Sequence, residues 1–471
     1  MSELPPGWME AQFGSLGEIR FGKMLDKSKN RGAPTRYLRN INVRWFRFDL
    51  SDLQTLRLTP DELRSLSIRD GDLLICEGGE PGRCAVWRQG ANDFTYQKAL
   101  HRVRLRSGII PEFFMYQLAA DAATGRLRDS FTGTTIKHLT GENLKRYSVR
   151  VAPTVEQRRV VEKLEALFHR TDMCRERLRR TSEILRRFRE AVLEAAVSGR
   201  LTEEWRGSES LDGWKFEKAS DVCEKVQSGG TPKSGFQISD GVPFLKVYNI
   251  VSQRVDFAYR PQYVPPEVHE GVLGKSRVRP GDVLMNIVGP PLGKVAIVPD
   301  TYPEWNINQA ITLFRPGPSI ATHWLYIVLC SGRNVAEILH ETRGTVGQVN
   351  ISLSQCRNFI IPVPPRAEQC VIVDRVKELF AMHDRLESVL RDSTSRVERT
   401  IPAILKKAFR GKLVPQVPGE KPASVMVERI NAGQEETEPN ELRRPLGSVR
   451  APRRGKKAIV AGRETRDGKR A

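Results

Sequence analysis

The sequence has few of the features that mark secreted, membrane or metal-binding proteins. Its seven cysteines are scattered, odd in number and free of any CxxC pair, which argues against a disulfide framework and against a zinc site. No apolar run approaches the roughly 18 residues of a membrane span. The opening MSELPPGWMEAQF has neither the basic nor the apolar block of a signal peptide, so we expect a cytoplasmic location.

Signatures of catalysis are missing as well. GPPLGKV, residues 289–295, fails the phosphate-loop pattern because three residues instead of four separate its glycines and Val295 follows the Lys. VGPPLG and PVPPRA lack the residues that flank Pro-Pro in adenine methyltransferases, and there is no Gly-rich loop for a methyl donor. Asp72, Glu77 and Glu80 are a possible nuclease metal site, but the second copy of the repeat described below does not keep them. We therefore predict no catalytic residue and no metal site.

The strongest compositional signal is positive charge. The chain of 471 residues has 76 Lys and Arg against 56 Asp and Glu, a formal net charge of +20 at pH 7. Such a chain accumulates on polyanions and releases their counterions when it binds. Nucleic acid is the first partner to consider and an anionic membrane the second. The length favours two or three domains.

One sequence unit occurs twice. VEQRRVVEKLEALF at residues 155–168 returns as AEQCVIVDRVKELF at residues 367–380, inside a gapless match of 153–201 to 365–413. Upstream the match is weaker but keeps its order: YLRNIN with FLKVYN, RDGDLL with RPGDVL, and TGTT with RGTV. Internal repetition of this kind predicts two copies of one structural unit.

Apolar residues in the gapless part recur at alternating steps of four and three, as in a coiled coil. The seam runs from Val160 to Val192 in the first copy and from Ile372 to Ile404 in the second. We expect two long helices that pair in antiparallel fashion, with a globular domain at each end of the rod. The alternative is that each stripe packs against its own domain. Pro402 lies inside the second seam and predicts a kink or break near residue 400.

The remaining blocks predict an α+β fold class. DLLIC, CAVW, DVLMNIV and KVAIV are typical of strands, whereas PEFFMYQLAADAATGRL and THWLYIVLCSGRNVAEIL are typical of helices. The composition after Val414 indicates disorder. We expect mixed α/β domains at residues 1–152 and 205–364, helical regions at 153–204 and 365–413, and a basic disordered tail at 414–471.

A basic chain with two variable domains, two similar helices and no active site resembles the specificity subunit of a Type I restriction-modification enzyme. The resemblance rests on the Pro-x-x-Glu-Gln starts at 153 and 365, the heptad helices, the Gly-Asp turns at 71 and 281, and the GTT and GTV segments at 133 and 344. It implies two target-recognition domains, each of which reads half of a split target in double-stranded DNA. It implies no catalysis and no cofactor in this chain. The helices would set the spacer and dock two modification subunits that hold S-adenosylmethionine, and separate restriction or motor subunits would cut the DNA.

The repeat also sorts the candidate DNA contacts, because domains that read different half-sites share phosphate contacts and differ where base edges are read. Basic residues at matching positions are phosphate candidates, with solvated surface charge as the alternative: Arg39 with Lys246, Arg69 with Arg279, and Arg83 with Lys294. Base candidates are donor or acceptor side chains in unmatched loops: Arg36, Asn42, Arg44, Lys137, His138, Lys233, Gln253, Arg343, Gln348 and Asn350.

The two Glu-Gln pairs, Glu156 with Gln157 and Glu368 with Gln369, are candidates for docking a partner subunit. A capping box from Thr154 and Gln157 is an alternative for the first pair only, because the second copy has Arg366 at the position of Thr154.

Two other functions stay open at this point. One is a self-contained DNA nuclease or methyltransferase, which chemistry on DNA by the purified chain would identify. The other is a coiled-coil DNA-binding scaffold, which would bind without preference for one duplex over scrambled competitors.

Overall fold

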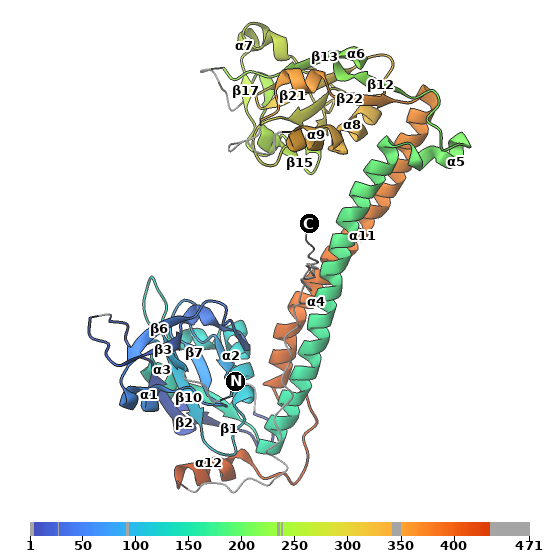
Figure 1. The fold of residues 1–471 in the computed structure, drawn as a ribbon. Coiled ribbons are helices and arrows are strands. Elements are labelled where there is room, and N and C mark those ends of the chain that lie inside the picture. The colour runs from blue at the N-terminus through green and yellow to red at the C-terminus, as the bar shows by residue number, and fades with distance from the viewer. Residues whose placement is uncertain are drawn as a thin grey trace, which may run out of the picture. The chain divides into compact units, whose positions relative to one another are not determined.

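The computed structural model describes residues 4–26, 28–90, 94–232, 236, 239–341 and 350–433. The chain divides into two compact units, Met1–Arg177 with Thr394–Ala471, and Leu178–Ser393 (Figure 1). Each unit contains one mixed α/β domain and part of each long helix. Within the described ranges, every helix is too short or too polar to span a lipid bilayer.

The first unit is built on two small sheets. A four-stranded antiparallel sheet has the order β2-β10-β7-β8, and a three-stranded sheet has the order β6-β3-β9 with β9 parallel to β3. Two further pairs are β1 with β11 and β4 with β5. The strands are β1 (Met9–Gln12), β2 (Gly17–Phe21), β3 (Ala33–Leu38), β4 (Val43–Arg44), β5 (Arg47–Phe48), β6 (Gln54–Leu58), β7 (Leu73–Cys76), β8 (Cys84–Val86), β9 (Phe94–Tyr96), β10 (Leu100–Leu105) and β11 (Ser148–Val151). The helices are α1 (Pro60–Leu66), α2 (Pro111–Thr124), α3 (Gly141–Arg146) and the first part of α4 (Thr154–Val197), with 3-10 turns η1 (Phe13–Ser15), η2 (Asn40–Asn42) and η3 (Arg126–Ser130).

The second unit repeats this topology strand for strand. Its sheets have the orders β13-β21-β18-β19 and β17-β14-β20, and its pairs are β12 with β22 and β15 with β16. The strands are β12 (Lys215–Lys218), β13 (Cys223–Ser228), β14 (Val242–Leu245), β15 (Ile250–Val251), β16 (Arg254–Val255), β17 (Tyr263–Val264), β18 (Val283–Asn286), β19 (Val295–Ile297), β20 (Asn306–Ile307), β21 (Ile311–Pro316) and β22 (Ile360–Val363). The helices are α5 (Glu203–Arg206), α6 (Ala219–Val222), α7 (Pro266–Glu270), α8 (Thr322–Cys330), α9 (Arg333–Glu341), α10 (Leu353–Arg357) and the first part of α11 (Arg366–Ala408), with η4 (Arg200–Thr202), η5 (Val247–Asn249) and η6 (Gly274–Ser276). The predicted α+β class and internal repeat are confirmed.

The long helices pair in antiparallel fashion inside each unit. In the first unit Arg159 on α4 contacts Glu420, which lies beyond the end of α11, and Arg175 Nη2 lies 2.7 Å from Glu398 Oε2. In the second unit the Arg189 guanidinium lies 4.2 Å from the centre of the Phe380 ring. Residue numbers rise on one helix as they fall on the other, as the heptad seams predict.

The start of each long helix packs into the core of its own domain as well. Val160 and Leu164 of α4 are buried with the apolar face of α2, and Ile372 and Val376 of α11 are buried with α8. Both predicted alternatives are therefore realised, because Leu405 and Ala408 of α11 are buried in the same core cluster as Val160, Leu164 and the residues of α2.

Three details differ from the sequence-based expectations. The α11 helix is not broken at Pro402, which lies on an exposed face where water can reach the carbonyl that the proline leaves without a donor. The predicted helix THWLYIVLCSGRNVAEIL is two helices, α8 and α9, because Gly332 between them has a φ of +69°. The assignment of 414–471 to a disordered tail is wrong for its first part: α12 (Ala423–Asn431) packs on the first unit.

Candidate nucleic-acid interface

The Glu-Gln pairs lie inside their units. Gln157 accepts a hydrogen bond from the backbone N–H of Ile110 at 3.1 Å and donates to the carbonyl of Ala152 at 2.8 Å. Gln369 accepts from the N–H of Ala321 at 2.8 Å and donates to the carbonyls of Ser319 and Pro364. Each glutamine thus holds the start of a long helix against the start of the domain helix, α2 or α8.

The two glutamates are buried beside the glutamines. Glu156 accepts a hydrogen bond from Gln416 at 2.6 Å, and burial raises its pKa. Glu368 accepts from Thr202 Oγ1 at 2.7 Å, from Arg206 and from the indole N–H of Trp214 at 2.9 Å. Because all four side chains are at most 1% exposed, the geometry favours a structural role. Docking of a partner by these residues stays a prediction.

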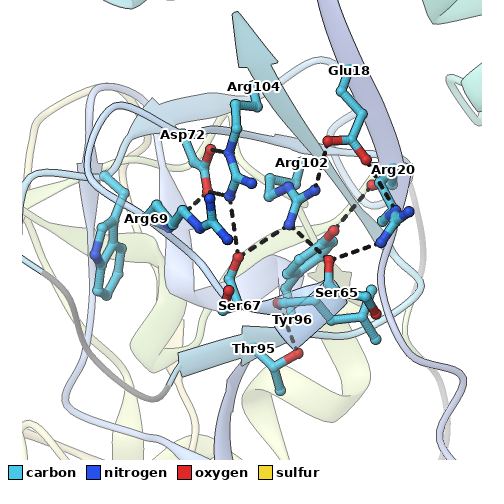
Figure 2. Close-up of polar contacts among 12 residues, drawn as sticks. Glu18, Arg20, Ser65, Ser67, Arg69, Asp72, Thr95, Tyr96, Arg102 and Arg104 are labelled. Carbon is cyan, nitrogen blue, oxygen red and sulfur yellow. Dashed lines mark hydrogen bonds and ion pairs between the residues drawn. The ribbon is translucent and has the colours of Figure 1, made fainter. Parts of the chain in front are cut away.

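The Gly-Asp turns position a repeated carboxylate (Figure 2). Asp72 is buried and accepts two hydrogen bonds of 2.8 Å from the guanidinium of Arg104, together with the backbone N–H of Arg69 at 2.7 Å. Asp282 has the same partners in the second unit, Arg315 at 2.8 Å twice and the N–H of Arg279 at 2.8 Å. The phosphate candidates Arg69 and Arg279 therefore occupy equivalent turns, and both side chains are exposed.

Two of the three carboxylates of the possible metal site at Asp72, Glu77 and Glu80 are already engaged by cationic or N–H donors. Arg104 binds Asp72, and Glu80 accepts from Arg83 Nη1 at 2.8 Å and from the Trp45 indole at 2.6 Å. Among the described residues, one group of three has the spacing of metal ligands, His383, Asp384 and Glu387 on α11, and two of its three members are exposed carboxylates.

Asn42 is not a base reader in this structure. It is 2% exposed, accepts from the N–H of Arg39 and donates to the carbonyls of Asp49 and Asp52 at 2.9 Å. Asn249 makes the equivalent bonds in the second unit. The interpretation of Asn42 as an unmatched residue is wrong, because both asparagines cap the same turn.

The remaining phosphate candidates already have partners within the chain, which limits their availability for contacts to DNA. Arg39 Nη2 lies 2.6 Å from Asp52, whereas the Lys246 ammonium lies 4.7 Å from the centre of the Phe236 ring. Arg83 donates to Glu80 and to the carbonyl of Asn40 at 2.9 Å. The backbone N–H of Lys294 donates to Asn286, and the lysine is half-buried.

The nine other base candidates separate into three groups. Arg36, Arg44, Lys137, His138 and Asn350 are exposed, as base readers must be. Gln253 is not free to read a base, because its side-chain oxygen accepts the N–H of Val295 at 2.6 Å. Lys233, Arg343 and Gln348 lie outside the described residues.

The exposed candidate His138 lies beside the loop between β7 and β8, which also carries the half-buried Arg83. The His138 ring lies against Gly78. A Cβ atom placed on this glycine would be 3.1 Å from His138 Nδ1. Arg83 anchors the same loop to Asn40, one residue after Arg39. Asn350 in the second unit corresponds to His138. The residue after each forms the same backbone hydrogen bond: Leu139 N–H donates to the Glu77 carbonyl, and Ile351 N–H donates to the Ile287 carbonyl. Arg36 lies apart on β3, with its guanidinium 4.5 Å from the centre of the Phe94 ring.

One buried residue had no sequence signal. Arg102 is 1% exposed and donates to the carbonyls of Ser65 at 3.0 Å and Ser67 at 3.1 Å, at the end of α1, and its Nη2 lies 3.3 Å from Glu18 (Figure 2). It lies two residues before Arg104, and Leu313 holds the same place before Arg315 in the second unit.

Both halves of the chain match one known family model. Residues 5–180 and 211–392 match the model described as Type I restriction modification DNA specificity domain. The specificity subunit of the Type I restriction enzyme EcoBI from Escherichia coli is 31% identical over 323 residues, which cover 64% of this chain and 67% of that protein. The specificity subunit of the enzyme EcoKI from Escherichia coli strain K12 is 27% identical over 460 residues, 91% of this chain and 96% of that protein.

A solved structure shares the fold. It is described as showing complex assembly and conformational transition of the type I R-M system, and one of its chains matches with a TM-score of 0.66 at 22% identity. The match covers 88% of this chain and 100% of that chain.

Proposed function

Since this chain belongs to the family of Type I restriction modification DNA specificity domains, we propose that it is the DNA sequence-recognition subunit of a Type I restriction-modification complex. The observation that carries the proposal is that the family match falls on both copies of the repeat, residues 5–180 and 211–392, and that both copies have the same strand order. The net charge of +20 suits a polyanionic partner.

Each domain would read one half of a split target. Exposed Arg, Lys, His and Asn side chains have the hydrogen-bonding groups that distinguish base pairs in the major groove. In the first domain these are Arg36, Arg44, Lys137 and His138, and in the second domain Asn350. The exposed Arg69 and Arg279 have equivalent positions in the two domains, which suits contacts to phosphates.

The chain would direct the complex to its DNA target and hold its subunits together, and the partner subunits would catalyse methylation and cleavage. It would bind no cofactor, and S-adenosylmethionine would be held by modification subunits, two per chain, that dock on the long helices. Restriction or motor subunits would join the same complex. The paired helices α4 and α11 support this division, since a long helical pair is suited to fix the spacing between two readers and to offer docking surface.

Mapping of modified adenines tests the proposal. The genome of the host would be compared with that of a strain in which this chain is deleted. We expect methylation to disappear at one split sequence, which would give both half-sites and the spacer at once. Unchanged methylation, together with failure of the chain to co-purify with a methyltransferase, would refute it. Methylation or cleavage of DNA by the chain alone would instead identify an enzyme.

A further inference from the structure

The second unit contains a pocket at a place that a side chain fills in the first unit. It has a volume of about 270 Å³ and lies between the β15-β16 turn, α8 and the first part of α11. Its floor is apolar and buried: Ile327, Val373 and Val376 are at most 6% exposed. Tyr326 and Phe380 also line it.

In the first unit the equivalent place is occupied by an aromatic ring of the chain itself. Phe46, in the β4-β5 turn, lies 5.0 Å from the Tyr116 ring and 5.6 Å from the Phe168 ring, measured between ring centres. Tyr116 is on α2 and Phe168 is on α4, which correspond to α8 and α11. The hairpin therefore fills the space between domain helix and long helix with its own side chain.

The second unit has the same turn without the aromatic residue. Gln253 follows Asn249 by four positions, as Phe46 follows Asn42, and both residues have a positive φ, +61° and +68°. The Gln253 side chain is directed to the N–H of Val295, with which it forms a hydrogen bond of 2.6 Å. Gln253 therefore leaves unfilled the space that Phe46 fills in the first unit, and the rings of Tyr326 and Phe380 stay partly exposed there.

Two positions around the two places differ in charge. Glu165 in the first unit follows Gln157 by eight positions, and Lys377 in the second unit follows Gln369 by eight. Likewise Glu112 lies two residues after Ile110, and His323 two residues after Ala321. Repulsion between Glu112 and Glu165 is one cause, after burial, of the raised pKa of Glu165. The second-unit rim has Arg254, His323 and Lys377, with Asp384 as its single acidic member.

We propose that this pocket docks a segment of the modification subunit in which an aromatic side chain has a carboxylate beside it. The inference rests on the proposed function and names the chemistry of that contact. A cavity of about 150 Å³ accepts benzene, so the volume suffices for one ring with its flanking groups. Buried aromatic anchors commonly dominate the energy of an interface.

Two other occupants fit less well. The basic segment after Arg443 has the same sign of charge as the rim. DNA phosphates suit Arg254 and Lys377 but would leave the partly exposed rings of Tyr326 and Phe380 in water. A protein segment with an aromatic and an acidic side chain can place its ring on the apolar lining and its carboxylate beside Arg254 or Lys377.

The test uses the full chain with its own modification subunit in titration calorimetry. Q253F closes the pocket with the residue that the first unit uses, and K377E gives the rim the charge of the first unit. We expect each to weaken at least tenfold the binding of the modification subunit that docks at the second unit, one of the two proposed per chain. K275E changes charge equally in an exposed turn of the same unit, away from the pocket, and should leave the affinity unchanged. If Q253F unfolds, the exposed K377E carries the test.

The outcomes separate the two proposals. Unchanged affinity in Q253F and K377E overturns the pocket assignment while the wild-type complex upholds the function. A loss of DNA affinity in K377E with intact subunit docking also overturns it and identifies a DNA contact. If the wild-type chain binds no modification subunit, the proposed function falls and the inference falls with it.

Discussion

The guanidinium of Arg102 is buried with its Nη2 atom 3.3 Å from the Glu18 carboxylate, and Glu18 is itself half-exposed. An ion pair with a half-exposed carboxylate does not by itself offset the free-energy cost of burying the arginine. Its two bonds to the carbonyls of Ser65 and Ser67 hold α1 against the sheet. The second unit does without such an arginine and has Leu313 at the same place.

Arg102→Leu should therefore loosen α1. Each carbonyl keeps a second donor, Arg20 Nη1 for Ser65 and Arg104 Nη2 for Ser67, but loses its bond to the buried guanidinium. We expect a loss of about 1 kcal/mol in the free energy of unfolding. Urea denaturation measures it, and hydrogen exchange should show faster exchange in Pro60–Leu66. Arg20→Ala is the control, because Arg20 is more exposed and also contacts Glu18 and the Ser65 carbonyl. Equal losses in the two variants would contradict the assigned role.

Glu165 should make stability depend on pH. Burial and the neighbouring Glu112 raise its pKa from 4.5 to about 7. The folded state thus keeps a proton that the unfolded chain releases near pH 4.5, and stability declines as the pH rises from 4.5 through 7. Allowing for partial exposure, we expect a loss of about 1 kcal/mol. Denaturation of wild type and Glu165→Gln from pH 5 to 8 should show the decline in wild type alone.

Substitutions at the DNA-reading candidates should have two different signatures. Arg44→Ala and His138→Ala should each relax the preference for one base pair of a half-site, at a cost of about 1–3 kcal/mol. Arg69→Ala should weaken binding to all duplexes alike and lower the salt dependence by about one counterion. Competition binding with matched and single-mismatch duplexes at several salt concentrations distinguishes them. A uniform loss in all three variants would reassign Arg44 and His138 to the phosphates.

Removal of the segment after residue 413 should destabilise the first unit. The segment contributes Gln416 to Glu156 and Glu420 to Arg159, and α12 buries Ala423, Met426, Val427 and Ile430. Exposure of the apolar surface that these side chains cover should cost at least about 3 kcal/mol. Limited proteolysis and urea denaturation would compare chains that end at residues 413 and 433. The longer chain should behave as the full chain does.

Gln157→Ala tests the helix attachment. The variant leaves the N–H of Ile110 buried without an acceptor, and we expect a cost of about 1–3 kcal/mol. Val155→Ala in the same turn is a suitable control, because Val155 is 49% exposed and its replacement should change stability by less than about 0.5 kcal/mol. Equal thermal unfolding of both variants would contradict the prediction.

Periodicity was enough to predict the long helices and their antiparallel pairing, since a seam over many turns has one physical explanation. The burial of a residue by another element of the fold was not predictable from the local sequence pattern. Arg102 sits in an alternating strand and is covered by α1, which the local pattern does not reveal. Other signals were present but missed: Asn42 follows Arg39 by three positions as Asn249 follows Lys246, and ASVMVERIN has apolar residues at helical spacing. The placement of the two domains at opposite ends of a rod stays a prediction.

The bonds of Gln157 and Gln369 all go to main-chain groups: the N–H of Ile110 or Ala321 and nearby carbonyls. Every amino acid except proline supplies that N–H, and every amino acid supplies the carbonyls. These bonds therefore place no demand on the side chains of the domain they hold. The attachment through these two glutamines is therefore compatible with many different side chains at the start of the domain helix, whereas the apolar packing on α2 and α8 is not.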